Sequence, residues 1–256
     1  MTTTSIVERI QMFKKVKQFN ITKCKVLHIG KGNPMYDYYL ERAKPETLFV
    51  TDSEKDIGVM FDCHLNFDIH IHNIVNKATK CIGIIFRSFE YLNVDMFMAL
   101  YKSIIRPILE YCNCIWNPLF KRQSVVIENV QRRATKLLPL LEHMTYGDRL
   151  KYLNLPSLKY RRRRGDLIQL YKIVHNIDNL NASNFFRYSH NTHTRGDRFK
   201  IYIGRYKTNV RQNVFLARTV STWNKLSFKT KSANCVTSFK NSIDRELKDL
   251  KYVYDD

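Results

Sequence analysis

The sequence contains no long hydrophobic run. No apolar stretch approaches the roughly eighteen residues that a membrane-spanning helix needs, as the short run 81–86 illustrates. The first ten residues have no basic segment followed by an apolar one, so no secretory signal is expected. We therefore expect a protein that is neither membrane-spanning nor secreted, and that resides in the nucleus or the cytoplasm.

Paired cysteines and other catalytic or metal-binding patterns are also missing. The six cysteines are scattered mostly through apolar segments, and Cys112 and Cys114 have no second pair to complete a zinc site. No Gly-rich phosphate loop and no nucleophile–histidine set follows from the spacing. We expect buried free thiols in a reducing compartment, and no cofactor bound by this chain.

Acidic residues are few beside basic ones. The 256 residues include 43 Lys and Arg against 23 Asp and Glu, which gives a formal net charge of +20. Such an excess destabilises a compact chain by self-repulsion unless an anionic partner uses it. Nucleic acid is the first candidate partner and an anionic membrane surface the second. A hydrophobic content of 44% nevertheless predicts one large or two modest folded domains.

Three segments between residues 66 and 138 have the pattern of amphipathic helices. Apolar residues recur at intervals of three and four in the segments 66–89, 93–115 and 126–138. Asn93 is expected to cap the second helix, and Pro107 to kink or end it because proline removes a backbone donor. These patterns predict a three-helix bundle.

The third of these helices carries a basic stripe opposite its apolar side. At the helical pitch, the stripe consists of Asn129, Arg132, Arg133 and Lys136. A coherent basic face of this kind can hold a phosphate backbone. The alternative is an ordinary solvated charged face.

The segments on either side of the bundle predict different secondary structure, mostly strands before it and mostly helices after it. Alternating residues predict strands at 23–29, 35–40, 48–50 and 57–61, too few to enclose a core. A short amphipathic pattern precedes them at 6–19. After the bundle, helices are expected at 156–177, 213–226 and 236–250, and a strand at 199–203. The predicted fold class is α+β, predominantly α, with regions 1–62, 63–153 and 154–256.

Four consecutive arginines open the helix predicted at 156–177. On a helical projection Arg161 and Arg162 lie farther from the apolar face than the two arginines that follow. A buried guanidinium is tolerated only when it is paired. Arg164 is therefore either exposed or paired with an acid such as Asp148 or Glu142.

The sequence ends in an acidic pair, Asp255 and Asp256, after Val253 and Tyr254. Two-metal polymerase chemistry needs such a pair on a rigid hairpin with a third carboxylate nearby. No returning strand follows the pair here, and Val253 stands where an aromatic residue would be required. We expect a frayed acidic tail rather than a catalytic site.

Several short strings extend over nearly the whole chain, and together they match one family. They are Asn20-x-x-Lys23-Cys24-Lys25-Val26-x-His28-x-Gly30, Lys55-Asp56-Ile57-Gly58-Val59-x-x-Asp62, Leu65-x-Phe67-x-x-His70, Tyr101-Lys102-Ser103-x-Ile105-Arg106-Pro107-Ile108-Leu109-Glu110-Tyr111-Cys112, Val130-Gln131-Arg132-Arg133-Ala134-Thr135-Lys136, Asn154-Leu155-Pro156-Ser157-Leu158-x-Tyr160-Arg161-Arg162-x-Arg164-Gly165-Asp166-Leu167 and Trp223-Asn224-x-Leu226. In this order they resemble the end of the palm, the primer grip, the thumb and the post-thumb region of reverse transcriptases of non-LTR (LINE, jockey-type) retrotransposons.

The resemblance implies part of an RNA-directed DNA polymerase, whose thumb and primer grip hold the RNA template and the DNA primer. The fingers and the catalytic aspartates of the family would lie upstream, so this chain is expected to be inactive alone. Mg²⁺ is then expected only in the complete polymerase. Lys23 matches a palm lysine thought to act as a general acid, although an exposed strand lysine is an equal alternative. The chain departs from the family at Ser227, where the family has proline.

Two further hypotheses remain open beside the polymerase fragment. One is a stand-alone basic helical module that binds DNA or RNA without any polymerase role. The other is a working polymerase whose palm and fingers come from another polypeptide. Under the fragment hypothesis, the partners are RNA and DNA as a template–primer duplex and no membrane, and contacts with the nucleic acid are expected from Lys23, Lys25, Lys77, Lys80, Lys102, Arg106, Arg132, Arg133, Lys136, Arg161 and Arg162.

Overall fold

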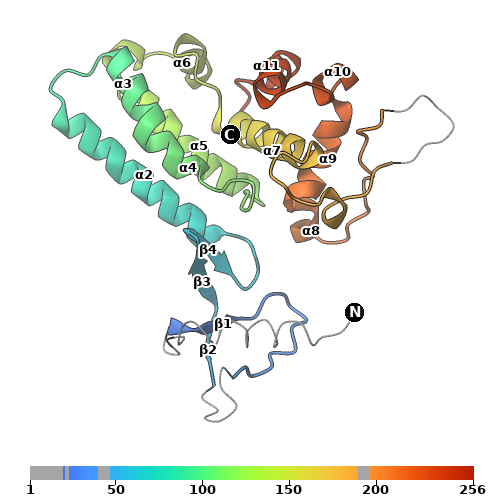
Figure 1. Ribbon diagram of the computed structural model, residues 1–256. Coiled ribbons are helices and arrows are strands. Elements are labelled where there is room, and N and C mark those ends of the chain that lie inside the picture. The colour runs from blue at the N-terminus through green and yellow to red at the C-terminus, as the bar shows by residue number, and fades with distance from the viewer. Residues whose placement is uncertain (1–19, 21–22, 40–46, 190–196) are drawn as a thin grey trace. The chain divides into compact units, whose positions relative to one another are not determined.

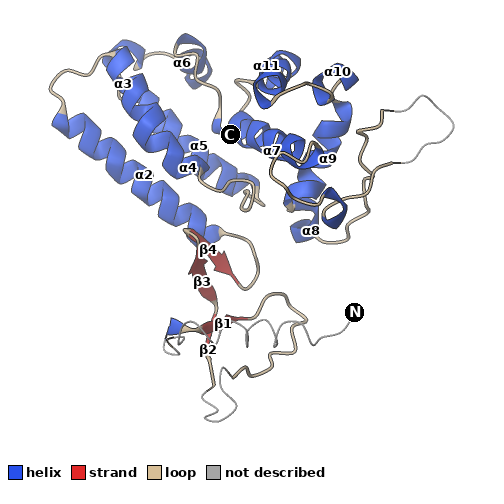
Figure 2. Ribbon diagram, viewed as in Figure 1, coloured by secondary structure: helices blue, strands red, loops and turns tan. Residues whose placement is uncertain are grey.

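The structure is a computed structural model of the chain, and it describes residues 20, 23–39, 47–189 and 197–256. The chain divides into two compact units, Met1–Leu65 and Asn66–Asp256. The fold is α+β and predominantly α, so the predicted fold class is confirmed (Figures 1 and 2). The pattern at 6–19 lies outside the described residues. Among those that are described, no helix is long and apolar enough to cross a membrane.

The first unit contains two small sheets. β1 (Lys25–Leu27) pairs in parallel with β2 (Phe49–Thr51), and β3 (Ser53–Asp56) pairs antiparallel with β4 (Val59–Asp62). The predicted strand at 35–40 is reduced, within the described residues, to one bridge between Tyr39 and Thr47. Each sheet has only two strands, as expected from a segment too short to enclose a core.

The prediction of a strand over 57–61 is wrong at its start. Ile57 and Gly58 form the turn between β3 and β4, with φ angles of 42° and 84°. Two consecutive left-handed residues suit a tight hairpin turn, and glycine adopts this conformation without strain. Ile57 is 79% exposed, so its place in the apolar alternation did not mark a buried strand position.

The second unit begins with the predicted helical bundle. Its helices are α2 (Asp68–Ser88), α3 (Val94–Leu100), α4 (Arg106–Glu110) and α5 (Lys121–Lys136). α2 buries Ile71, Ala78, Ile82 and Ile85, which repeat at helical spacing, and it packs against α4 and α5. Asn93 caps α3, because its side chain accepts a hydrogen bond from the N–H of Met96 at 2.8 Å. The three predicted helices and the cap are confirmed.

Pro107 disturbs the second predicted helix as its chemistry requires. A π-helical turn (Tyr101–Ile105) separates α3 from α4, and the N–H of Arg106 donates to the carbonyl of Tyr101, five residues earlier. Because proline cannot donate the next helical hydrogen bond, the helix accommodates one extra residue in the turn before Pro107. α4 ends at Glu110, short of the predicted end at 115.

The rest of the second unit includes a long helix over Leu158–Val174, and the segments that follow the bundle are mostly helical. The elements are α6 (Tyr146–Tyr152), α7 (Leu158–Val174), α8 (Asn209–Asn213), α9 (Phe215–Lys225), α10 (Phe228–Lys231), α11 (Val236–Glu246) and 3₁₀ turns at Pro139–Leu141, Ala182–Asn184 and Lys248–Leu250. α7, α9 and α11 share a core that includes Leu170, Trp223, Phe239 and Ile243. α5 also packs against α7, so the predicted regions 63–153 and 154–256 lie within one compact unit.

The strand predicted at 199–203 is not formed. Ile201 makes one isolated bridge with Tyr188, and the side chain of Asn224 bonds both backbone groups of Ile201, at 3.0 and 2.8 Å. Because this amide occupies the donor and the acceptor that a neighbouring strand would use, the alternation at 199–203 produces no ladder. The prediction of a strand at 199–203 is therefore wrong.

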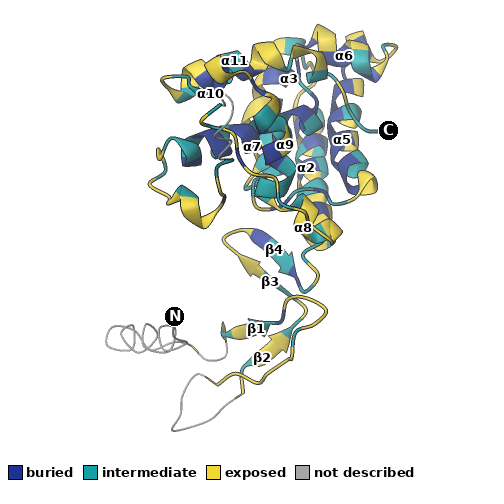
Figure 3. Ribbon diagram, turned by 90° about the vertical axis from the view of Figure 1, so that its right-hand side faces the viewer, coloured by how far each residue is buried: buried dark blue, intermediate teal, exposed yellow. Residues whose placement is uncertain are grey.

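The cysteines are free, as predicted, but they are not fully buried. Cys235 is exposed and the other five are partly buried. Figure 3 shows that the buried positions of the second unit lie along the inner sides of its helices. The expectation of buried thiols is therefore wrong, because none of the six is fully buried.

Candidate nucleic-acid interface

The buried side of α5 is polar as well as apolar. Gln131 is fully buried, accepts a hydrogen bond from the hydroxyl of Tyr101 at 2.6 Å, and donates to the hydroxyl of Tyr146 at 3.1 Å. Glu128 is also fully buried and accepts from Tyr146 at 2.6 Å and from the N–H of Leu158, at the start of α7, at 3.2 Å. Burial raises the pKa of Glu128, although these hydrogen bonds oppose the shift. This network fixes α5 to α7 and decides which side of α5 faces solvent.

The exposed side of α5 carries the predicted basic stripe in part. Asn129, Arg133 and Lys136 are exposed, and no described carboxylate lies within ion-pair distance of the two cations. Their spacing of three and four residues places them on one side of the helix. These three residues are called the α5 stripe below. They form a cationic surface that can reach a phosphate backbone without any change in the core.

Arg132 differs from the other members of the predicted stripe. Its side chain is 33% exposed, and its guanidinium lies over the rings of Tyr146 and Tyr254, with its carbon 5.1 and 5.5 Å from the ring centroids. One of its terminal nitrogens pairs with Asp256 at 2.6 Å. Arg132, predicted to lie in the basic stripe opposite the apolar side, is therefore partly covered, because two aromatic rings and a carboxylate surround its guanidinium.

The arginines of α7 are mostly paired. Arg161 forms a two-pronged ion pair with Glu110 of α4, and Arg164 forms another with Asp244 of α11 at 2.6 and 2.8 Å. Of the two alternatives left open for Arg164, exposed or paired, the structure shows the paired one, but the partner is Asp244 rather than Asp148 or Glu142. Arg161 was predicted to contact nucleic acid, whereas here its guanidinium joins α7 to α4.

Arg162 is the most buried of the four, contrary to its predicted position on the outer side. It is 4% exposed, and one terminal nitrogen, Nη2, donates to the hydroxyl of Ser124 at 2.8 Å. Its other terminal nitrogen, Nη1, is buried and has no hydrogen-bond partner among the described residues. Burial lowers the pKa of the guanidinium. A buried cation that lacks a bonded carboxylate is costly, which marks this position as unusual.

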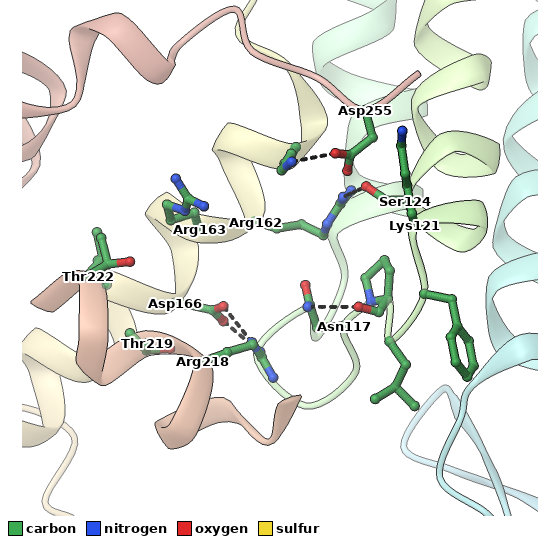
Figure 4. Close-up of a pocket in the computed structure, with 15 residues that line it drawn as sticks. Asn117, Lys121, Ser124, Arg162, Arg163, Asp166, Arg218, Thr219, Thr222 and Asp255 are labelled. Atoms are coloured by element: carbon green, nitrogen blue, oxygen red, sulfur yellow. Dashed lines mark hydrogen bonds and ion pairs between the residues drawn. The ribbon is translucent and has the colours of Figure 1, made fainter. Parts of the chain in front are cut away.

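Arg162 lies in the wall of a pocket of about 220 Å³ (Figure 4). The pocket is bounded by the start of α5 and the preceding loop, by one side of α7, by α9 and by Asp255. On its α9 side, Arg218 forms a two-pronged pair with Asp166 at 2.8 Å and donates to the carbonyl of Cys114 at 2.9 Å. These bonds hold α9 and the loop before α5 against α7, so the pocket has a fixed wall.

The acidic end of the sequence is docked rather than frayed, which corrects the prediction. The hydroxyl of Ser157 donates to the carbonyl of Val253 at 2.6 Å, and the ring of Tyr254 meets Tyr146 edge-on. Asp255 then pairs with Lys159 at 2.5 Å at the mouth of the pocket. Burial acts to raise the pKa of Asp255, but hydrogen bonds from Lys159 and Ser124 hold it below its ordinary value. Both aspartates are therefore engaged by cations of this chain.

The remaining predicted contact residues lie at separate places. In the first unit Lys23 is exposed and Lys25 pairs with Glu54 at 2.8 Å. In the second unit Lys77 and Lys80 are exposed on α2, Lys102 is exposed on the π-helical turn, and Arg106 is partly buried at the start of α4. Sequence reasoning missed Lys159 and Lys121, which line the pocket. The signal that could have found them is their position at the starts of two helices, where positive partial charge already accumulates.

Comparison with known proteins shows similarity to a distant relative. The chain is 28% identical over 134 residues to an uncharacterized protein of Caenorhabditis elegans. The matched segment covers 51% of this chain and 65% of the relative. The chain therefore spans less than two thirds of that protein's length. No known protein-family model matches the chain. No solved structure matches it either.

Proposed function

We propose that this chain binds nucleic-acid duplexes through phosphate contacts made by its helical unit, as the thumb-like part of a retrotransposon reverse transcriptase. The observation that carries the binding proposal is the α5 stripe, whose two cations have no carboxylate partner among the described residues. The net charge of +20 supports an anionic partner. The polymerase assignment rests on the sequence resemblance. The thumb-like string Val130–Lys136 of that resemblance contains both cations of the stripe, Arg133 and Lys136.

The chemistry of the stripe limits what it can recognise. Arginine and lysine contact phosphate oxygens, which position a protein on a duplex but carry no base sequence. Binding should therefore be largely independent of sequence and sensitive to salt. A stand-alone binding module would show the same behaviour, so this property tests the binding and not the polymerase origin.

The binding proposal is tested by fluorescence anisotropy with a labelled RNA–DNA duplex. The variant Arg133→Gln/Lys136→Gln should bind at least about tenfold more weakly at low salt, because each lost phosphate contact removes counterion release and an ion pair. The matched control is Lys225→Gln/Lys229→Gln, which removes two exposed charges from α9 and α10. An equal loss in both variants would show that net charge, rather than the α5 stripe, governs binding.

The proposal assigns no catalytic step to this chain. Asp255 is held by Lys159 and Asp256 by Arg132, so neither carboxylate is free to hold a metal ion in this arrangement. Purified protein should not extend a primer on an RNA template with Mg²⁺ or Mn²⁺. Incorporation that disappears in Asp255→Asn/Asp256→Asn would contradict this view of the acidic end.

A further inference from the structure

The pocket beside Arg162 has an excess of positive charge. Five cationic side chains and two carboxylates line it. Arg218 and Asp166 neutralise each other, and so do Lys159 and Asp255. The three cations without an ion pair among the described residues are Lys121, Arg162 and Arg163, although Glu128 and Asp255 lie close enough to attract the charge of Arg162. A region of this kind attracts an anion, and the N-terminus of the 16-residue helix α5 at its edge adds positive partial charge.

The unpartnered Nη1 of Arg162 is a second and independent indication of a ligand. The residue is 96% buried, and the nearest buried carboxylate on α5, that of Glu128, already accepts from Tyr146 and from the backbone at the start of α7. Buried polar groups are almost always satisfied in native structures. Figure 4 shows Arg162 extending across the pocket toward Ser124, on the side where Asp255 lies. Arg162 is among the residues that line the pocket, so an acceptor bound there would lie next to its guanidinium.

The pocket is large enough for a group bigger than water. Its volume is about 220 Å³, whereas a single water needs only about 10–15 Å³ of such space. Its polar lining includes the hydroxyls of Ser124 and Thr222 as well as the five cations. A tetrahedral oxyanion can accept hydrogen bonds from donors in several directions at once, and this lining supplies them.

Asp255 already places an anionic group at the mouth. Its carboxylate is 19% exposed and bonded to Lys159, and it approaches from the end of the sequence rather than from a helix that forms the core. We propose that this pocket binds a phosphate group, which replaces the Asp255 carboxylate on Lys159 and is further held by Lys121 and Arg162. Asp255 is then an internal competitor for the site.

The phosphate can belong to a polynucleotide or be a free ion. Where it belongs to a polynucleotide, the inference rests on the function proposed above. Inorganic phosphate and an RNA–DNA duplex are therefore used as separate probes, the first by calorimetric titration and the second by fluorescence anisotropy. If Asp255→Asn binds both the duplex and inorganic phosphate more tightly than the wild type does, the site is assigned to polynucleotide phosphate. If the variant binds only inorganic phosphate more tightly, the site is assigned to the free ion.

The decisive variants change the competitor and the partners. Asp255→Asn should tighten binding of inorganic phosphate about tenfold, within the range of ordinary coupling energies. Its matched control is Asp249→Asn, which removes an exposed carboxylate that does not line the pocket and should leave phosphate affinity unchanged. Lys121→Gln should weaken phosphate binding about tenfold, as expected from the loss of one charge-assisted hydrogen bond. Lys121 is exposed, so this variant is expected to fold normally.

Three results would overturn the proposal. They are the absence of phosphate binding in both the wild-type chain and Asp255→Asn, an affinity that is insensitive to Lys121→Gln, and equal effects of the two aspartate variants. The outcome is separable from that of the proposed function. Strong duplex binding through the α5 stripe without phosphate binding would remove the pocket proposal alone. Phosphate binding without duplex binding would remove the proposed function alone.

Discussion

Arg133 and Lys136 of α5 look like Arg161 and Arg164 of α7 in the sequence, but the two pairs of residues differ in the structure. Arg133 and Lys136 of α5 lie on the surface without a carboxylate partner among the described residues. On α7, Arg161 and Arg164 are joined to Glu110 and Asp244, and so hold neighbouring helices together. The comparison teaches that charge density along the chain does not identify a binding surface. What identifies it is the absence of an internal partner.

The largest effect is expected where an internal pair is most buried. Arg218→Met leaves Asp166, with a side chain only 7% exposed, as an unpaired buried carboxylate. Breaking such a pair typically costs about 3–5 kcal/mol. Urea unfolding should show this loss against Arg211→Met, an exposed α8 position, as the control. A loss below about 1 kcal/mol would mean that the pair does not hold α9 to α7.

A smaller effect is expected for the first paired arginine of α7. Arg161→Gln removes two charge-assisted hydrogen bonds to Glu110, whose side chain is 19% exposed. The free energy of unfolding should fall by about 1.5–3 kcal/mol, the range for hydrogen bonds to charged groups. Duplex affinity should change little, because the guanidinium is not available for phosphate. Normal stability combined with a large loss of duplex affinity would reverse the assignment of Arg161.

Arg132 is intermediate between the unpaired surface cations of α5 and the paired arginines of α7. Arg132→Gln removes the contacts with the rings of Tyr146 and Tyr254 and the pair with Asp256. We expect a loss of about 1 kcal/mol in unfolding free energy, because Asp256 is 77% exposed and solvent screens that pair. Hydrogen exchange should also rise in the backbone of residues 251–256. Unchanged exchange there would show that Arg132 does not hold the acidic end.

The smallest stability effect concerns the second paired arginine and depends on pH. Burial acts to raise the pKa of Asp244, but hydrogen bonds from Arg164 and Tyr160 lower it below the ordinary value of 3.8. A lowered carboxyl pKa stabilises the fold above pH 4, and this contribution is lost as the pH falls through the folded-state pKa. The side chain of Asp244 is 44% exposed, so Arg164→Gln should cost at most about 1 kcal/mol at pH 7. The difference from wild type should shrink below pH 4. A difference that is constant with pH would show that the pair with Asp244 is not its source.

The sequence predicted the parts of the fold that depend on local pattern. The apolar repeat of α2, the cap at Asn93 and the disturbance at Pro107 follow from residues within a few positions of one another, and all three are confirmed. The strand at 199–203 failed because Asn224, more than twenty positions away, takes the backbone groups of Ile201.

The candidate site was less predictable for the same reason. Ser124 meets Arg162 across 38 positions, and Ser157 meets Val253 across 96. Neither contact leaves a periodic signal in the sequence. Gln131 was not predicted as a core residue, because a polar residue on a helix is usually solvated. Its burial depends on the hydroxyls of Tyr101 and Tyr146, which come from other helices.

The central claim is that the α5 stripe, and not basic charge in general, contacts phosphate. The most direct test is the dependence of RNA–DNA duplex affinity on salt concentration. Each phosphate neutralised contributes a slope of about −0.9 in the plot of log affinity against log salt. Arg133→Gln/Lys136→Gln should flatten that slope by about two units with an unchanged melting temperature, while Lys225→Gln/Lys229→Gln should leave it unchanged. An unaltered slope in the α5 variant would contradict the account.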